Sequence, residues 1–230
     1  MGKKWWAKIL RIVGIILMGL TAAFTIMGGV GTTCVALDPT GYGDKFAGIA
    51  PYQWLYILFV VVTLAFGVMG ARAVLLLIRN RPNAYRYSVI ALVGGSIIGV
   101  IHVIVSRALR GGSMPVDMVT YMNILTLVVF LIFRIPPIWK EIGFGQPVSS
   151  NTAGTAGGLA SITSGAIALT IQYWMGSTHT IAGVNYADVW HIQLQFIGWF
   201  LILAGVLSIM WAAGAFLSKE TIARVASELE

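Results

Sequence analysis

The hydrophobic and polar positions divide the chain into six long apolar segments separated by short polar stretches. A helix needs about 20 mostly apolar residues to cross the ~30 Å hydrocarbon core of a bilayer, and the segments are of this order of length. Turn-forming residues such as Asp38-Pro39 and Pro136-Pro137 separate them. The segments run over residues 9–37, 54–78, 85–108, 116–135, 159–175 and 189–217. The pattern predicts an all-α fold, a six-span polytopic transmembrane helical bundle.

The basic residues indicate how this bundle would be oriented. If the N-terminus lies inside, twelve Lys and Arg residues fall on the cytoplasmic side, and only Lys45, Arg107 and Arg110 fall outside. Cytoplasmic loops carry the excess of Lys and Arg in membrane proteins. We therefore expect both termini to be cytoplasmic and the protein to be integral to the plasma (cytoplasmic) membrane.

Composition supports this class and excludes others. Apolar residues make up 58% of the chain and charged residues only 10%, which is too little charge to coat a soluble surface. The basic residues are scattered at the ends of apolar segments, so the net charge of +7 is not the basic face of a nucleic-acid-binding domain. We expect membrane lipids as partners and no nucleic acid.

Composition also divides the chain into parts. Residues 1–140 are predicted to form a four-span unit with tight connections. Residues 141–158 are rich in Gly, Ser and Thr, the composition of a flexible cytoplasmic linker. Residues 159–217 form a two-span C-terminal hairpin, and residues 218–230 a short amphipathic cytoplasmic tail with Ile222, Val225 and Leu229 at helical spacing.

Small residues recur on single helical faces in three of the segments. In the third, Gly95, Gly99, His102 and Ser106 follow one another at steps of four, three and four. Membrane helices associate by close packing, so faces of small residues mark helix interfaces. These glycine faces predict packing within the bundle, and also association with a protein partner or with a second copy.

Polar residues inside apolar segments are the candidates for a site, because burying them in a membrane costs free energy. On the orientation above they all fall in the outer half of the membrane, within spans three to six, and predict an outward-facing polar cavity. The candidates for lining a ligand cavity are His102, Ser106, Asn123, Gln172, His191 and Gln195. The alternative is that each of these groups only bonds a neighbouring backbone group.

His102 and His191 also raise the possibility of a haem or quinone anchor, since two histidines on separate helices are the minimum for a b-type haem. Their depths argue against the pairing: His102 lies ~11 Å from the outer end of its helix and His191 only ~4 Å, at 1.5 Å per residue. We assign no cofactor, no metal site and no catalytic residue, because the sequence has no nucleophile, phosphate or HExxH motif and Cys34 is its one cysteine.

The sequence thus favours a non-catalytic membrane protein, an accessory or scaffold component of a membrane complex. The alternatives are a substrate-binding membrane subunit or transporter that uses the outward-facing cavity, and a haem- or quinone-binding anchor. No residue pattern favours an enzyme.

Overall fold

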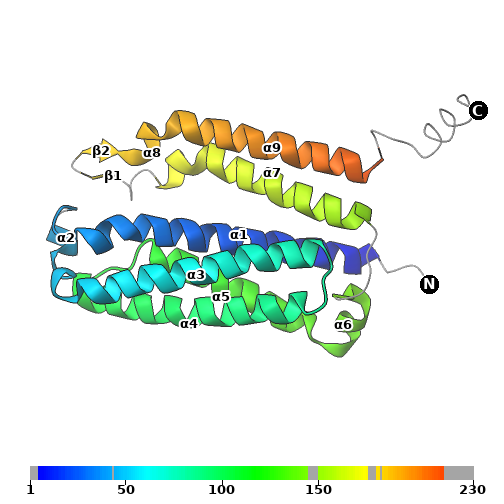
Figure 1. Ribbon diagram of the computed structural model, residues 1–230, viewed down its shortest axis with the longest axis horizontal. Helices are drawn as coiled ribbons and strands as arrows, with labels where there is room; N and C mark the ends of the chain where they lie inside the picture. The colour runs from blue at the N-terminus through cyan, green and yellow to red at the C-terminus, as the bar shows by residue number, and fades with distance from the viewer. Residues whose placement is uncertain (1–4, 43, 145–149, 176–179, 182, 215–230) are drawn as a thin grey trace, which may run out of the picture.

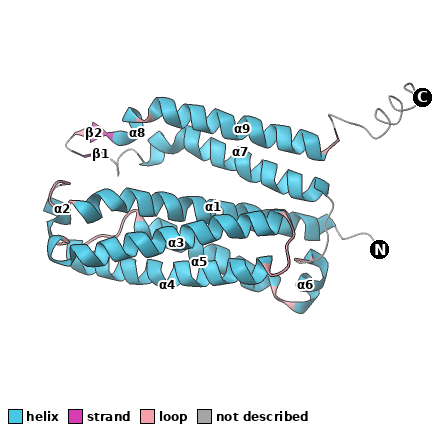
Figure 2. Ribbon diagram, in the orientation of Figure 1, coloured by secondary structure: helices cyan, strands magenta, loops and turns pink. Residues whose placement is uncertain are grey.

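The computed structural model describes residues 5–42, 44–144, 150–175, 180–181 and 183–214. In these residues the fold is helical apart from one short hairpin of strands, and six of the helices are long and apolar enough to cross a membrane (Figure 2). The predicted all-helical class and the number of long apolar helices are confirmed. The long helices are α1 (Trp5–Leu37), α3 (Gln53–Ile78), α4 (Ala84–Arg110), α5 (Val116–Phe133), α7 (Ser150–Met175) and α9 (His191–Ala212).

Short elements connect the long helices. Strands β1 and β2 pair antiparallel with Thr180 opposite Asn185. The short elements are α2 (Asp44–Ala47), η1 (Ala50–Tyr52), α6 (Pro136–Ile142), β1 (Thr180–Ile181), β2 (Val184–Asn185) and α8 (Tyr186–Val189). We call the end of the bundle where α1 begins and α6 lies the α6 end, and the opposite end the α2 end (Figure 1).

The sharp turns follow from local backbone chemistry. Helix α4 ends at Gly111, whose φ of 69° lies in the left-handed region that glycine adopts at least cost. Helix α6 begins at Pro136, where the fixed φ of proline suits a first helical turn and its missing N–H costs nothing. These two turns bring α4, α5 and α6 back on one another.

The expected linker is partly helical. Helix α7 begins at Ser150, so residues 150–158 form its first turns rather than a flexible segment. The physical reason is that their small side chains pack: Gly154 lies against Ala212 of α9, and Ala156 is buried in the core near the α6 end. The expected amphipathic tail at residues 218–230 lies outside the described residues.

Helix α1 is the centre of the fold. It packs against α3, α5, α6 and α7, and α4 completes a four-helix unit by packing on α3 and α5 (Figure 1). Helix α9 packs on α7, and within the described residues it makes no comparably extensive contact with α1, α3, α4 or α5. Among the described residues, the hairpin of α7 and α9 is therefore attached to the four-helix unit mainly through α7.

The glycine faces identified in the sequence are occupied by helices of the same chain. A Cβ at Gly205 of α9 would lie 2.5 Å from the carbonyl oxygen of Gly158 in α7, and a Cβ at Gly165 would lie 2.6 Å from that of Gly198. The backbones of α7 and α9 thus touch at two levels, as close-packed membrane helices do.

One charged side chain is buried at the α6 end. The Arg11 guanidinium donates to the carbonyl oxygens of Gly143 (3.2 Å) and Leu77 (3.3 Å) and to Asn80 Oδ1 (2.8 Å). It also lies over the Phe144 ring, 5.2 Å from its centroid. The two carbonyls belong to the C-terminal ends of α3 and α6, where the helix dipole is negative and attracts a cation. Arg11 therefore joins three helix ends.

Candidate functional site

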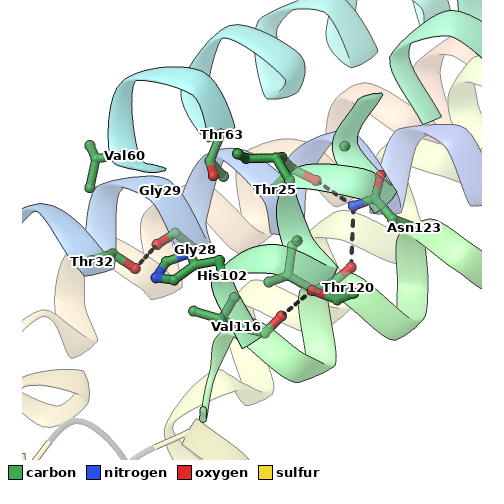
Figure 3. A pocket seen from close by; sticks show the side chains of 14 residues that line it. Thr25, Gly28, Gly29, Thr32, Val60, Thr63, His102, Val116, Thr120 and Asn123 are labelled. Atoms are coloured by element: carbon green, nitrogen blue, oxygen red, sulfur yellow. Dashed lines mark hydrogen bonds between the residues drawn. The ribbon is translucent and has the colours of Figure 1, made fainter. Parts of the chain in front are cut away.

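A small cavity lined by both polar and apolar side chains lies inside the four-helix unit (Figure 3). Its residues come from the half of the unit nearer the α2 end. Its volume is ≈ 20 Å³, and side chains from α1, α3, α4 and α5 line it. A cavity of roughly 10–15 Å³ or more can hold one water molecule if polar partners are present. The space therefore fits a ligand of about the size of water.

His102 is the most unusual residue of this lining. Its side chain is 3% exposed, and its Nε2 atom has no hydrogen-bond partner among the described residues. The ring stacks on Phe59 at a centroid distance of 4.4 Å and meets the edge of Tyr56 at 5.3 Å. Tyr56 is itself fixed by a 2.8 Å hydrogen bond between its hydroxyl and that of Ser106. The aromatic rings hold the imidazole in place while one nitrogen is left for a ligand.

Asn123 forms a second polar group in the lining. Its Nδ2 donates to Thr25 Oγ1 at 3.0 Å and to the carbonyl oxygen of Val119 at 3.2 Å (Figure 3). Thr25 donates in turn to the carbonyl of Thr21, whose hydroxyl bonds that of Thr126 at 2.7 Å. These bonds tie α1 to α5 and hold the Asn123 side chain in one orientation.

Glycines of α4 leave room for the polar groups. A Cβ at Gly95 would lie 2.7 Å from Asn123 Oδ1, and a Cβ at Gly99 would lie 2.6 Å from Thr120 Oγ1. Real Cβ atoms do not approach other atoms this closely, so any larger residue would displace these groups or fill the cavity. The stepwise pattern of small residues on α4 thus shapes the cavity as well as the packing.

The structure brings together some of the sequence candidates and not others. His102 and Asn123 line the cavity, and Ser106 is next to it through Tyr56. The remaining candidates lie in the hairpin, outside the lining: Gln172 in α7, and His191 and Gln195 in α9.

The two histidines considered for haem are not brought to one site. His102 is enclosed in the four-helix unit, whereas His191 is the first residue of α9, which packs on α7 and α8. The space beside His102 is also far smaller than a porphyrin. The arrangement offers no pair of axial ligands among these two residues.

Sequence reasoning missed the contribution of α1 to the cavity. Thr25, Gly28, Gly29 and Thr32 all belong to the lining. The sequence does contain a pattern that indicates this face of α1. Thr21, Thr25, Gly28 and Thr32 follow one another at steps of four, three and four, the same spacing as the face of α4. Threonine inside a membrane helix was not read as polar, since its hydroxyl usually bonds the carbonyl four residues earlier.

The side chains that line the cavity include no carboxylate, ammonium or guanidinium group. Its lining offers hydroxyls, one carboxamide and one imidazole, and no Asp, Glu, Lys, Arg or Cys. Of the side chains that commonly act as general acids or bases, this lining holds only His102. A small polar molecule would be held there by hydrogen bonds alone.

Six helices of this length and hydropathy are consistent with a multi-pass protein embedded in a membrane. Comparison of the chain with protein-family models, with curated proteins and with solved structures finds no match. The functional argument therefore depends on the geometry of this chain.

Proposed function

We propose that this protein is a non-catalytic component of a complex in the plasma membrane, with both termini in the cytoplasm, and that it meets its partner through the outward face of α9. The distribution of Lys and Arg supports the orientation: Lys8, Arg79 and Arg134 lie near the α6 end, which is then cytoplasmic. The partner is a transmembrane helix of another protein.

The outward face of α9 is broad, apolar and aromatic. Phe196, Trp199 and Phe200 are 78%, 61% and 69% exposed. With Leu203 they repeat at i, i+3, i+4 and i+7, the spacing by which one helix presents a face to another. The glycine faces named above are filled internally. Other described helices also expose apolar side chains, but α9 exposes the most aromatic ones.

The depth of Trp199 supports a protein partner over lipid. Trp199 follows His191 by eight residues and so lies ~12 Å into the helix, not far from the middle of a ~30 Å hydrocarbon core. Tryptophan is enriched at membrane interfaces because its indole N–H needs a polar partner. No hydrogen bond from this N–H is found among the described residues. A neighbouring helix with a hydroxyl, amide or free carbonyl at that depth would supply the acceptor.

Site-specific photo-crosslinking tests this proposal. A photoreactive residue at Phe196 is expected to give a discrete adduct with another protein in intact membranes. The same residue at Ile97, which is 57% exposed and in the middle of α4, is expected to label lipid only. Trp199→Ala should reduce the protein adduct about tenfold, and Trp199→Phe should have part of that effect because it removes only the N–H group. Lipid labelling alone at both positions would contradict the proposal.

The cavity supports a second candidate, the capture or passage of a small polar molecule. The observation that favours it is the partnerless Nε2 of His102 beside a space of ≈ 20 Å³. The size restricts the ligand to the class of water and ammonia.

Permeability of proteoliposomes distinguishes this second candidate. If the molecules pass through the cavity, Gly99→Val should abolish protein-dependent water and ammonia permeability in stopped-flow measurements, because its side chain would occupy the space beside Thr120. Gly19→Ala is the control, since its Cβ would make only an ordinary 3.9 Å contact with Ala160. Equal permeability of wild type and Gly99→Val would exclude passage through the cavity.

A further inference from the structure

A second hollow lies at the α6 end of the four-helix unit, on its surface. It has a volume of ≈ 390 Å³ and lies between the first turns of α4, the end of α5 and helix α6. The residues that matter for its chemistry are Tyr85, Arg86, Val89, Ile90, Arg134 and Trp139. We call this hollow the basic groove.

Two arginines give the basic groove its charge. Arg86 and Arg134 are both exposed, and neither forms an ion pair with a carboxylate in the part of the chain that the structure describes. The Arg134 guanidinium lies 4.6 Å from the centroid of the Trp139 ring and 6.0 Å from that of Tyr85. The two rings pack near the guanidinium and restrict its position, and a guanidinium can bond a phosphate through two N–H groups.

The beginning of α4 adds to the positive potential. Helix α4 has 27 residues, and its N-cap residue Asn83 makes no side-chain capping bond. The helix dipole places partial positive charge at this end, near Arg86. The helix end therefore strengthens a site that the two arginines define.

The basic groove continues into an apolar wall. Val89 and Ile90 follow Arg86 along α4, and Ile90 is 48% exposed. Arg134 follows Phe133, the last residue of α5, so the arginines lie where spanning helices end. A membrane places phosphate headgroups at this level and acyl chains beside the apolar residues farther along the helix.

We propose that the basic groove binds an anionic phospholipid, with its phosphate between Arg86 and Arg134 and one acyl chain along Val89 and Ile90 of α4. Charge complementarity selects an anionic over a zwitterionic headgroup. The apolar wall selects a lipid over a free phosphate ion. The lipid site is independent of the partner proposed for α9 and requires only that the six long helices lie in a membrane.

Native mass spectrometry of the full chain tests the site. Protein purified in mild detergent and stripped of lipid is titrated with phosphatidylglycerol and with phosphatidylcholine of the same acyl chains. Each basic residue near an anionic surface contributes about fivefold in affinity. Arg86→Gln is therefore expected to weaken phosphatidylglycerol binding about fivefold, and the double variant R86Q/R134Q about 25-fold.

The matched control is Arg72→Gln. Arg72 is also exposed and also lies over an aromatic ring, that of Tyr87 at 5.3 Å, but it does not line the basic groove. This control should bind phosphatidylglycerol as the wild type does. Arg86→Gln keeps the test valid if loss of the Arg134–Trp139 contact unfolds the double variant. Among the described residues the Arg86 side chain forms no hydrogen bond, ion pair or ring contact that the substitution would remove.

The outcomes separate the lipid from other occupants. Preference for phosphatidylglycerol that is lost in the variants and not in the control supports the proposal. Equal binding of the two lipids, or equal loss in Arg72→Gln, would overturn it. Glycerol 3-phosphate represents the headgroup without acyl chains. If the protein bound glycerol 3-phosphate as well as phosphatidylglycerol, the choice of a lipid would be overturned.

Discussion

Arg11→Leu is expected to lower the free energy of unfolding by about 3 kcal/mol, because a hydrogen bond from a charged donor contributes about 1.5–3 kcal/mol. The side chain is 3% exposed and joins the ends of α3 and α6. Its loss would leave the carbonyls of Leu77 and Gly143 without their donor and remove the contact with Phe144. A buried acceptor left in this way costs about 1–3 kcal/mol by itself.

Thermal unfolding in detergent measures this effect. Lys8→Leu is the matched control, because it removes the same charge from an exposed position one turn earlier in α1. Arg11→Lys should fall between wild type and Arg11→Leu, since an ammonium keeps the charge and loses the planar fork of donors. If Arg11→Leu melted at the same temperature as Lys8→Leu, the hydrogen bonds of Arg11 at the α6 end would contribute nothing to the stability of the fold.

Gly205→Leu is expected to separate α9 from α7 at a cost of about 3 kcal/mol, the upper range for inserting a side chain into a packed contact. The new side chain would meet backbone: a Cβ at Gly205 lies 2.5 Å from the Gly158 carbonyl oxygen and 3.0 Å from the Ile162 nitrogen. A side-chain neighbour could rotate away, but the backbone of α7 can yield only by moving as a helix. Among the described long helices, only α7 is in extensive contact with α9. No other contact of this size in the described residues therefore keeps the hairpin closed.

Two measurements check the separation. The melting temperature should fall, and spin labels at exposed Ile104 of α4 and Leu203 of α9 should show a broader distance distribution in a Cys34→Ser background. Gly31→Leu is the control, because nothing lies within 4 Å of a Cβ at Gly31. A distance distribution as narrow as that of the control would show that the close approach of α7 and α9 is not needed.

The long helices could be predicted from the sequence because the bilayer imposes one simple requirement on each, about 20 apolar residues between polar ends. The predicted and observed helix boundaries agree most closely where strong turn-forming residues adjoin the helix, as at Val116 and at the end of α3 near Asn80. The start of α7 was missed because its glycines and serines resemble a linker. Their small size instead permits contact with α9. The residue pattern within one segment does not reveal which other helix packs against it.

The site was only partly predictable for a related reason. A helical pattern states which residues share a face but not which helix that face meets. Asn123 was recognised as polar, yet its partner Thr25 lies 98 residues earlier in the sequence. Arg11 and Arg134 are two of the twelve basic residues that the sequence places on the cytoplasmic side, and there only their charge is used. One proved to be buried, and the other stacks on Trp139 in the basic groove.

The central position of α1 has a consequence for biosynthesis. Of the six long helices, α1 is synthesised first. The partners of its polar side chains come from much later in the chain: Leu77 for Arg11, Asn123 for Thr25, Thr126 for Thr21 and finally Gly143 for Arg11 again. Until Gly143 has been synthesised, Arg11 lacks one of its acceptors, although Leu77 and Asn80 are already present. Synthesis of α1 and completion of the four-helix unit are therefore separate events, and the second requires translation through Gly143.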